Sequence, residues 1–240
     1  MPKPIDMFNE QCNPRIMQLL SEKSTVKQEV FRKSHDYFAL LKNIVSQIAV
    51  NLNTDICKVD ETVKVEFKDK NNFECEIHFG GDILLFNMQT NVFTFDKSHA
   101  IWRNSYVQDD ERRAYFVMIN IYNFLADSFR YQRMEDMGIL LGRLFINREG
   151  HFFVEGKRQL GFMFSDLARQ EIDEQSLKDV VDTAIIQGLE FDLTVPDYRE
   201  AMLVSVGEIM ATSNELHLKT SKKVELGYYS RMESSNKKIK

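Results

Sequence analysis

The amino-acid sequence predicts an α+β protein, in which an antiparallel β-meander and a second short antiparallel sheet pack with a long N-terminal helix, a buried central helix and two C-terminal helices. Three patterns predict this class. Residues 62–95 alternate apolar and polar side chains at period two, as half-buried strands do. Residues 25–52 and 115–129 place apolar side chains at helical spacing. Between residues 138 and 156, glycines separate short segments that suit a second hairpin.

The composition is that of an ordinary globular protein. Hydrophobic residues make up 43% of the 240 residues and charged residues 28%, which allows a substantial core. We expect one globular unit over residues 1–218, with possible lobes at 1–108 and 109–218, and a basic, mobile tail at 219–240. The whole chain has a net charge of −5, whereas the tail has more Lys and Arg than Glu. An acidic globular unit argues against binding to the phosphate backbone of a nucleic acid. Only the basic tail is therefore left to contact nucleic acid.

The sequence favours a cytoplasmic protein without membrane contact. No segment reaches the ~18 uninterrupted apolar residues of a membrane span, and the first residues lack the apolar run of a signal peptide. Cys12, Cys57 and Cys75 are odd in number and widely spaced, which favours reduced thiols over disulfides or zinc.

Two helices are expected before the strands. Asn13 and Pro14 suit the cap and first turn of a short helix that ends near Lys23. Thr25 begins a longer helix, since its spacing to Gln28 fits a capping box. The longer helix has one apolar seam that either packs across a sheet or pairs with a second copy of the chain; its residues include Phe31, Phe38, Leu41, Val45, Ile48 and Leu52.

Residues 62–95 predict a four-strand meander. Apolar positions in 63–67 and 73–79 come to one face if residues 69–71 form the loop. Residues 83–88 form an apolar third strand and residues 92–95 a fourth. The following loop, residues 98–108, presents Trp102, Arg103 and Tyr106, which could stack on a base or a peptide or could anchor the loop itself.

Residues 109–137 predict a central helix. The positive N-terminal end of its dipole suits the acidic residues Asp109, Asp110 and Glu111. Gly138 directly follows its expected C-terminal end. Apolar side chains between Tyr115 and Phe129 cover most of the circumference of such a helix, so it would be buried on most sides.

A second sheet is expected around residues 147–150, whose Asn-Arg-Glu-Gly sequence fits a turn with a left-handed glycine. This turn sets Arg143 opposite Glu155. If Gly156 and Lys157 form a second turn, Glu155 also faces Arg158. The resulting charged row has an excess of positive charge and could bind a small anion; its candidate site residues are Arg143, His151, Glu155, Lys157 and Arg158. Two alternatives are a cross-strand ion network, and a helix starting near residue 160 that would remove Arg158 from the row.

Two helices close the chain. Asp173 is expected to cap the first, between Ile172 and Leu177, and its apolar positions continue to Gly188. Pro196 is expected to open the second.

No motif in the sequence points to a specific enzyme class: there is no phosphate-binding glycine loop, no paired-histidine metal helix and no serine elbow. One strand face does bring together carboxylates, an imidazole and a lysine, a set that could hold a divalent metal in a nuclease or could simply be a solvated face; its residues are Glu66, Lys68, Glu74, Glu76 and His78.

The function expected from these patterns is non-enzymatic binding or assembly through protein contacts, with self-association and without a cofactor. The surfaces that would carry it are the helix seam, represented by Leu41 and Ile48, and the loop with Trp102, Arg103 and Tyr106. The alternatives are a domain that senses a small anion such as a nucleotide and, third, a metal-dependent nuclease.

Overall fold

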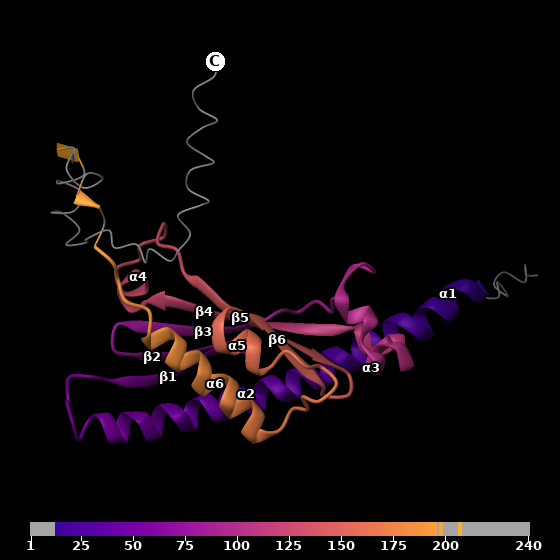
Figure 1. Ribbon diagram of the computed structural model, residues 1–240, viewed down its shortest axis with the longest axis horizontal. Helices are drawn as coiled ribbons and strands as arrows, with labels where there is room; N and C mark the ends of the chain where they lie inside the picture. The colour runs from indigo at the N-terminus through magenta and orange to yellow at the C-terminus, as the bar shows by residue number, and fades with distance from the viewer. Residues whose placement is uncertain (1–12, 196, 199–205, 208–240) are drawn as a thin grey trace, which may run out of the picture.

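A computed structural model describes residues 13–195, 197–198 and 206–207 of the chain (Figure 1). Its centre is one antiparallel sheet of six strands, in which each strand is hydrogen-bonded to the next in the sequence. The strands are β1 (Val65–Asn71), β2 (Glu74–Phe79), β3 (Asp82–Met88), β4 (Phe116–Leu125), β5 (Ile139–Asn147) and β6 (Phe152–Gly156). Helices pack on this sheet, so the α+β class is confirmed.

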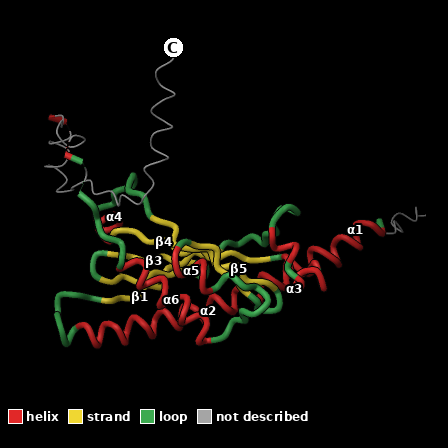
Figure 2. Tube along the Cα trace, in the orientation of Figure 1, coloured by secondary structure: helices red, strands yellow, loops and turns green. Residues whose placement is uncertain are grey.

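A single helical rod runs along one side of the sheet (Figure 2). It consists of α1 (Pro14–Leu19), a π-helical turn (Leu20–Ser24) and α2 (Thr25–Ile56). Asn13 caps it as expected, because its side chain accepts a hydrogen bond from the Arg15 backbone N–H at 2.9 Å. Helix α2 begins at Thr25 as expected, but the expected end of the first helix near Lys23 is wrong, because the backbone stays helical through the π turn.

The main core lies between the sheet and two helices. From α2 it takes Phe38, Leu41 and Val45, and from α6 (Glu174–Leu189) it takes Leu177 among others. Helix α6 begins as expected at Asp173, whose carboxylate accepts from the Ser176 backbone N–H in a reciprocal capping box.

The expected central helix is wrong, because residues 116–125 form strand β4 in the middle of the sheet. Alternate residues point to opposite faces: Ile119 and Ile121 join the main core, while Phe116 lies in a second cluster on the other face. A strand buried on both faces has an almost continuous apolar sequence, which resembles the sequence of a helix buried all round. The β-branched and aromatic residues of this run suit a strand.

With β4 in place, the two expected sheets are one. The strands on both sides of residue 109 therefore belong to the same sheet. The expected fourth strand at residues 92–95 makes only a single bridge, between Phe93 and Phe116. In the first hairpin the turn lies at residues 72–73, not 69–71, because a bulge between Asp69 and Asn71 lengthens β1.

The second hairpin is confirmed through residue 155. Phe145 pairs with Phe153 and Arg143 with Glu155, and Gly150 has the left-handed φ of +84°. The third strand expected after Lys157 is wrong, since α5 (Arg158–Met163) turns back onto β6. A Cβ on Gly161 would lie 2.0 Å from the Gly156 carbonyl oxygen, so only glycine allows this approach.

The opposite face of the sheet is covered at its two ends. At one end a loop with two 3-10 turns (Ala100–Arg103 and Glu111–Ala114) and α3 (Ser105–Asp109) covers the second cluster. At the other end lies α4 (Ala126–Arg130). The last expected helix, from Pro196, and the tail at 219–240 lie mostly or wholly outside the described residues. No helix in the described ranges combines the length and apolar character needed to cross a bilayer.

Candidate functional site

The charged row expected as an anion site lacks its second arginine. Arg143 forms an ion pair with Glu155, but Arg158 pairs with Glu190 instead, at 3.4 Å between Nη1 and Oε2. Lys157 is exposed beside α5. The missing third strand is the reason, since Arg158 belongs to α5 and faces α6 rather than β6.

Arg143 instead belongs to a polar row that crosses the sheet from β2 to β6. The strand register sets each residue beside the next, and the Asn87 side-chain amide donates to Glu74 Oε2 at 3.2 Å. The row therefore ends in a carboxylate on each side and has no excess of positive charge; its members are Glu74, Asn87, Asn120, Arg143 and Glu155.

His151 lies at the far end of β6 from Glu155 and has structural partners. Its ring stacks on Tyr106, with 4.3 Å between ring centres. Its Nδ1 lies 3.0 Å from the Leu167 carbonyl oxygen, and its Nε2 lies 3.4 Å from Glu171 Oε1. His151 therefore connects three segments and does not share a site with Arg143.

The Trp102 loop anchors itself. The Trp102 indole N–H donates to the Asp96 carbonyl oxygen at 3.0 Å, and the Lys97 ammonium lies 3.4 Å from the centre of its ring. Tyr106 donates to Glu149 Oε2 at 2.8 Å, and burial raises the pKa of this phenol far above its ordinary value. Of the three expected contact residues, only Arg103 is exposed.

The helix seam expected as an assembly surface is core. Leu41 is 0% exposed and Ile48 7% exposed, and both pack in the main cluster between α2 and the sheet. Neither is available to a partner in the folded chain.

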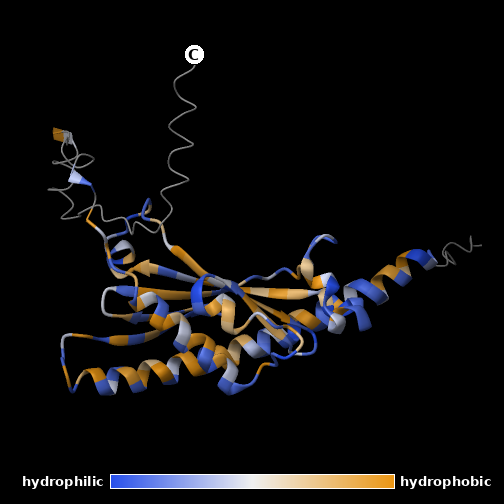
Figure 3. Cartoon of the chain, in the orientation of Figure 1, coloured by the Kyte–Doolittle hydropathy of each residue, from blue (hydrophilic) through white to orange (hydrophobic). Residues whose placement is uncertain are grey.

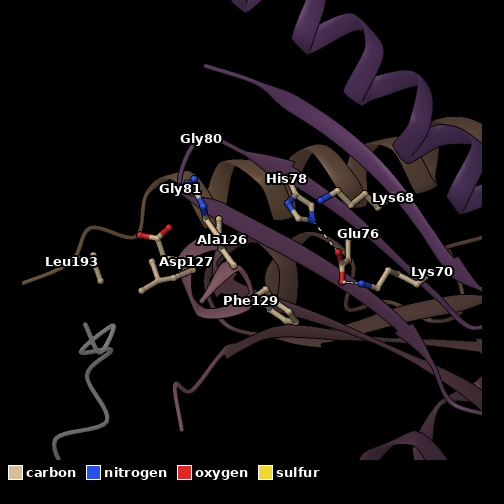
Figure 4. A pocket seen from close by; sticks show the side chains of 12 residues that line it. Lys68, Lys70, Glu76, His78, Gly80, Gly81, Ala126, Asp127, Phe129 and Leu193 are labelled. Carbon is tan, nitrogen blue, oxygen red and sulfur yellow. Dashed lines mark hydrogen bonds and ion pairs between the residues drawn. The ribbon is translucent and has the colours of Figure 1, made fainter. Parts of the chain in front are cut away.

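The structure instead presents a pocket on the sheet face opposite α2, at the end covered by α4 (Figure 4). Its volume is about 630 Å³, within the range of small-molecule sites. We call it the β1–β2 pocket and define it by six of its lining residues: Lys68, Lys70, Glu76, His78, Phe129 and Arg130.

A buried carboxylate organises the polar side of this pocket. Glu76 is only 2% exposed, yet it lies on the strand face that alternation places away from the main core. Its Oε2 lies 2.9 Å from His78 Nε2 and its Oε1 lies 3.2 Å from Lys70 Nζ. Lys70 reaches it from the bulge of β1. Figure 4 shows these three side chains converging, with Lys68 reaching toward them from β1.

The two partners keep Glu76 ionised. Burial by itself raises the pKa of this carboxyl, but the hydrogen bond from His78 and the Lys70 ammonium outweigh burial, so the pKa lies below its ordinary value. An ionised Glu76 accepts from His78 Nε2, and this fixes the orientation of the imidazole.

The pocket retains an excess of positive charge. Lys68, Lys70 and Arg130 oppose Glu76 and Asp127 along its lining, which leaves one positive charge when His78 is neutral. Among the described residues, neither Lys68 nor Arg130 has a carboxylate partner. These two cations are therefore available to a ligand.

The other side of the pocket is apolar and open. Leu125, Ala126, Leu193 and the half-exposed Phe129 line it. The β2–β3 turn at its rim consists of Gly80 and Gly81, where an added Cβ would meet no atom within 4 Å. The lining therefore suits a molecule that has both an anionic group and an apolar part.

The metal site considered from the sequence does not assemble in this geometry. Glu76 and His78 lie together, but Glu74 belongs to the polar row with Asn87. Across the residues that the structure describes, no three His, Cys, Asp or Glu side chains are close enough together to hold a metal ion. Of the thiols, Cys75 is in the core, where burial raises its pKa to about 12.

Sequence reasoning found only part of the pocket. Alternation identified Lys68, Glu76 and His78 as one strand face, but it missed Phe129 and Arg130, which lie about 50 residues further along the chain. No local signal connects α4 to β1, because their proximity depends on the order of strands in the sheet.

Comparisons with protein-family models, curated proteins and solved structures find no match to this chain.

Proposed function

We propose that this protein binds a small organic anion in the β1–β2 pocket. The observation that supports the proposal is the pair of cations, Lys68 and Arg130, that have no described carboxylate partner and line a pocket of ligand size. On a chain with a net charge of −5, a locally positive pocket concentrates anions where the rest of the surface repels them.

The ligand would be amphipathic. Its phosphate or carboxylate group would lie beside Lys68 and Arg130, and its apolar part would pack on Phe129 and Leu125. Ionised Glu76 would select one orientation of the ligand. It neutralises the charge of Lys70, and it would repel an anionic group placed against its own carboxylate. His78 offers the ligand an imidazole whose position is fixed by Glu76.

Native mass spectrometry of the full chain, followed by isothermal titration calorimetry, tests the proposal. AMP, citrate and inorganic phosphate serve as probes, so that a phosphate requirement is distinguished from a carboxylate requirement. We expect a retained small molecule or saturable binding of at least one probe.

Substitution of Lys68 by alanine should weaken that binding at least about tenfold, equivalent to ~1.4 kcal/mol, without a change in melting temperature. Lys64→Ala is the matched control, because it removes the same charge from an exposed residue just before β1 that does not line the pocket. Binding of no probe and no retained molecule, or equal effects of the two variants, would refute the proposal.

A further inference from the structure

The first turns of the helical rod project beyond the sheet (Figure 1). Every residue from 13 to 25 is exposed, and we call this segment the arm. Its apolar side chains include Ile16 at 51% and Leu20 at 49% exposure. Figure 3 shows this apolar character on a segment that no other described element covers. Neighbouring exposed apolar side chains of this kind are typical of contact surfaces.

The π turn sets the arm apart from α2. Its backbone closes an i→i+5 hydrogen bond, from the Thr25 N–H to the Leu20 carbonyl oxygen. One extra residue in this turn rotates α1 relative to the buried face of α2, whose first buried residue is Val26. The apolar side chains of the arm therefore do not simply continue the face that packs on the sheet.

A charged stripe runs beside the apolar face. Arg15 Nη1 donates to Gln18 Oε1 at 2.9 Å, and Gln18 Nε2 donates to Glu22 Oε1 at 2.9 Å. The stripe is positive at its N-terminal end, at Arg15, and negative at its C-terminal end, at Glu22. At helical spacing it follows the edge of the apolar face next to Leu19.

This pattern is complementary to itself when reversed. In a two-fold antiparallel pair of helices, the same edge of each helix meets its own copy. Pairing centred near Gln18 then places Arg15 of one copy beside Glu22 of the other, twice, and places Ile16 beside Leu20 across the seam. A parallel pair has no such reciprocal match.

We propose that the arm pairs antiparallel with the arm of a second copy of this chain, so that the protein forms a reversible homodimer. The globular bodies lie at opposite ends of the paired arms, which extend about 16 Å from Pro14 to Ser24 at ~1.5 Å per residue. The paired surface is smaller than the ~1,600 Å² of a standard interface, so the dimer depends on concentration. This inference is independent of the pocket.

Sedimentation velocity of the full chain over a range of concentrations is the test. We expect a monomer–dimer equilibrium, and Leu20→Glu should weaken the dimer at least about tenfold. The control is Val50→Glu, which introduces the same charge at a 62% exposed position of α2 outside the arm and should leave the dimer unchanged.

Charge exchange tests the antiparallel register. Arg15→Glu alone and Glu22→Arg alone should each weaken the dimer, because each places like charges together across the pair. The double exchange should restore the dimerisation constant of the unmodified chain, while circular dichroism confirms equal helix content. A chain that is monomeric at every concentration, a dimer that tolerates Leu20→Glu, or single exchanges without effect would each overturn the proposal.

Discussion

Glu76 is a charged residue of the pocket that is only 2% exposed. A buried carboxylate is stable only when it is paired and hydrogen-bonded, and Lys70 and His78 provide both contacts. Because these partners lower its pKa, the carboxylate contributes stability above the pKa of an unfolded glutamate, ~4.3. That contribution is lost as the pH falls through the lower pKa of the folded state.

Glu76→Gln should therefore reduce the free energy of unfolding at pH 7 by about 2 kcal/mol, since it leaves Lys70 and His78 without their buried partner. It should also flatten the decline of stability between about pH 5 and pH 3. Urea unfolding at several pH values measures both effects. Glu61→Gln, at an exposed turn position, is the control and should change neither. Equal pH profiles of the unmodified chain and Glu76→Gln would contradict the role given to this pair.

At the scale of elements, the central turns and the last turns of α2 differ in burial. Its central turns place Leu41 and Val45 against the sheet, where they are fully buried. Its last turns leave Val50 and Leu52 exposed. The apolar seam of the sequence is therefore mainly a folding surface, and the contact surface that we propose for the rod lies in the arm.

Leu41→Ala should lower the free energy of unfolding by about 3 kcal/mol, because it leaves a cavity between α2 and the sheet. Leu52→Ala, on the same helix at 40% exposure, should cost less than about 1 kcal/mol. Chemical denaturation compares the two variants, and sedimentation velocity reports their subunit number. If Leu41→Ala were as stable as the unmodified chain and had a different dimerisation constant, the seam would be an interface and not part of the core.

At the scale of the whole molecule, the two proposed surfaces lie at opposite ends. The arm projects at one end of the long axis, and α4, which borders the pocket, lies toward the other (Figure 1). The six-stranded sheet lies between them as one hydrogen-bonded unit. Substitutions at well-separated sites that share no partner act additively, to within ~0.5 kcal/mol.

Leu20→Glu should therefore leave the dissociation constant of the pocket for its probe unchanged to within about twofold. Lys68→Ala should likewise leave dimerisation unchanged. Calorimetry on the first variant and sedimentation on the second provide the two measurements. A change of tenfold or more in either would show that dimerisation and ligand binding are coupled through the sheet.

Several features of this protein follow from local sequence alone. Asn13 and Asp173 each cap the helix that they precede, and Gly150 takes the left-handed turn that sets Arg143 opposite Glu155. Alternation in residues 65–79 places Glu76 and His78 on one face. These features depend on backbone conformation and on neighbours within a few residues, so a short window of sequence contains their cause.

Other features were decided only by the tertiary structure. Residues 116–125 are a strand because the sheet buries both of their faces, a condition that their apolar pattern cannot distinguish from a buried helix. Arg158 left the charged row because α5 closes against β6 through Gly161. The pocket requires α4 and β1 to line the same space, and that placement depends on the order of strands β1 to β4 in the sheet. Burial and strand order involve residues far apart in the chain, which is why local patterns could not predict them.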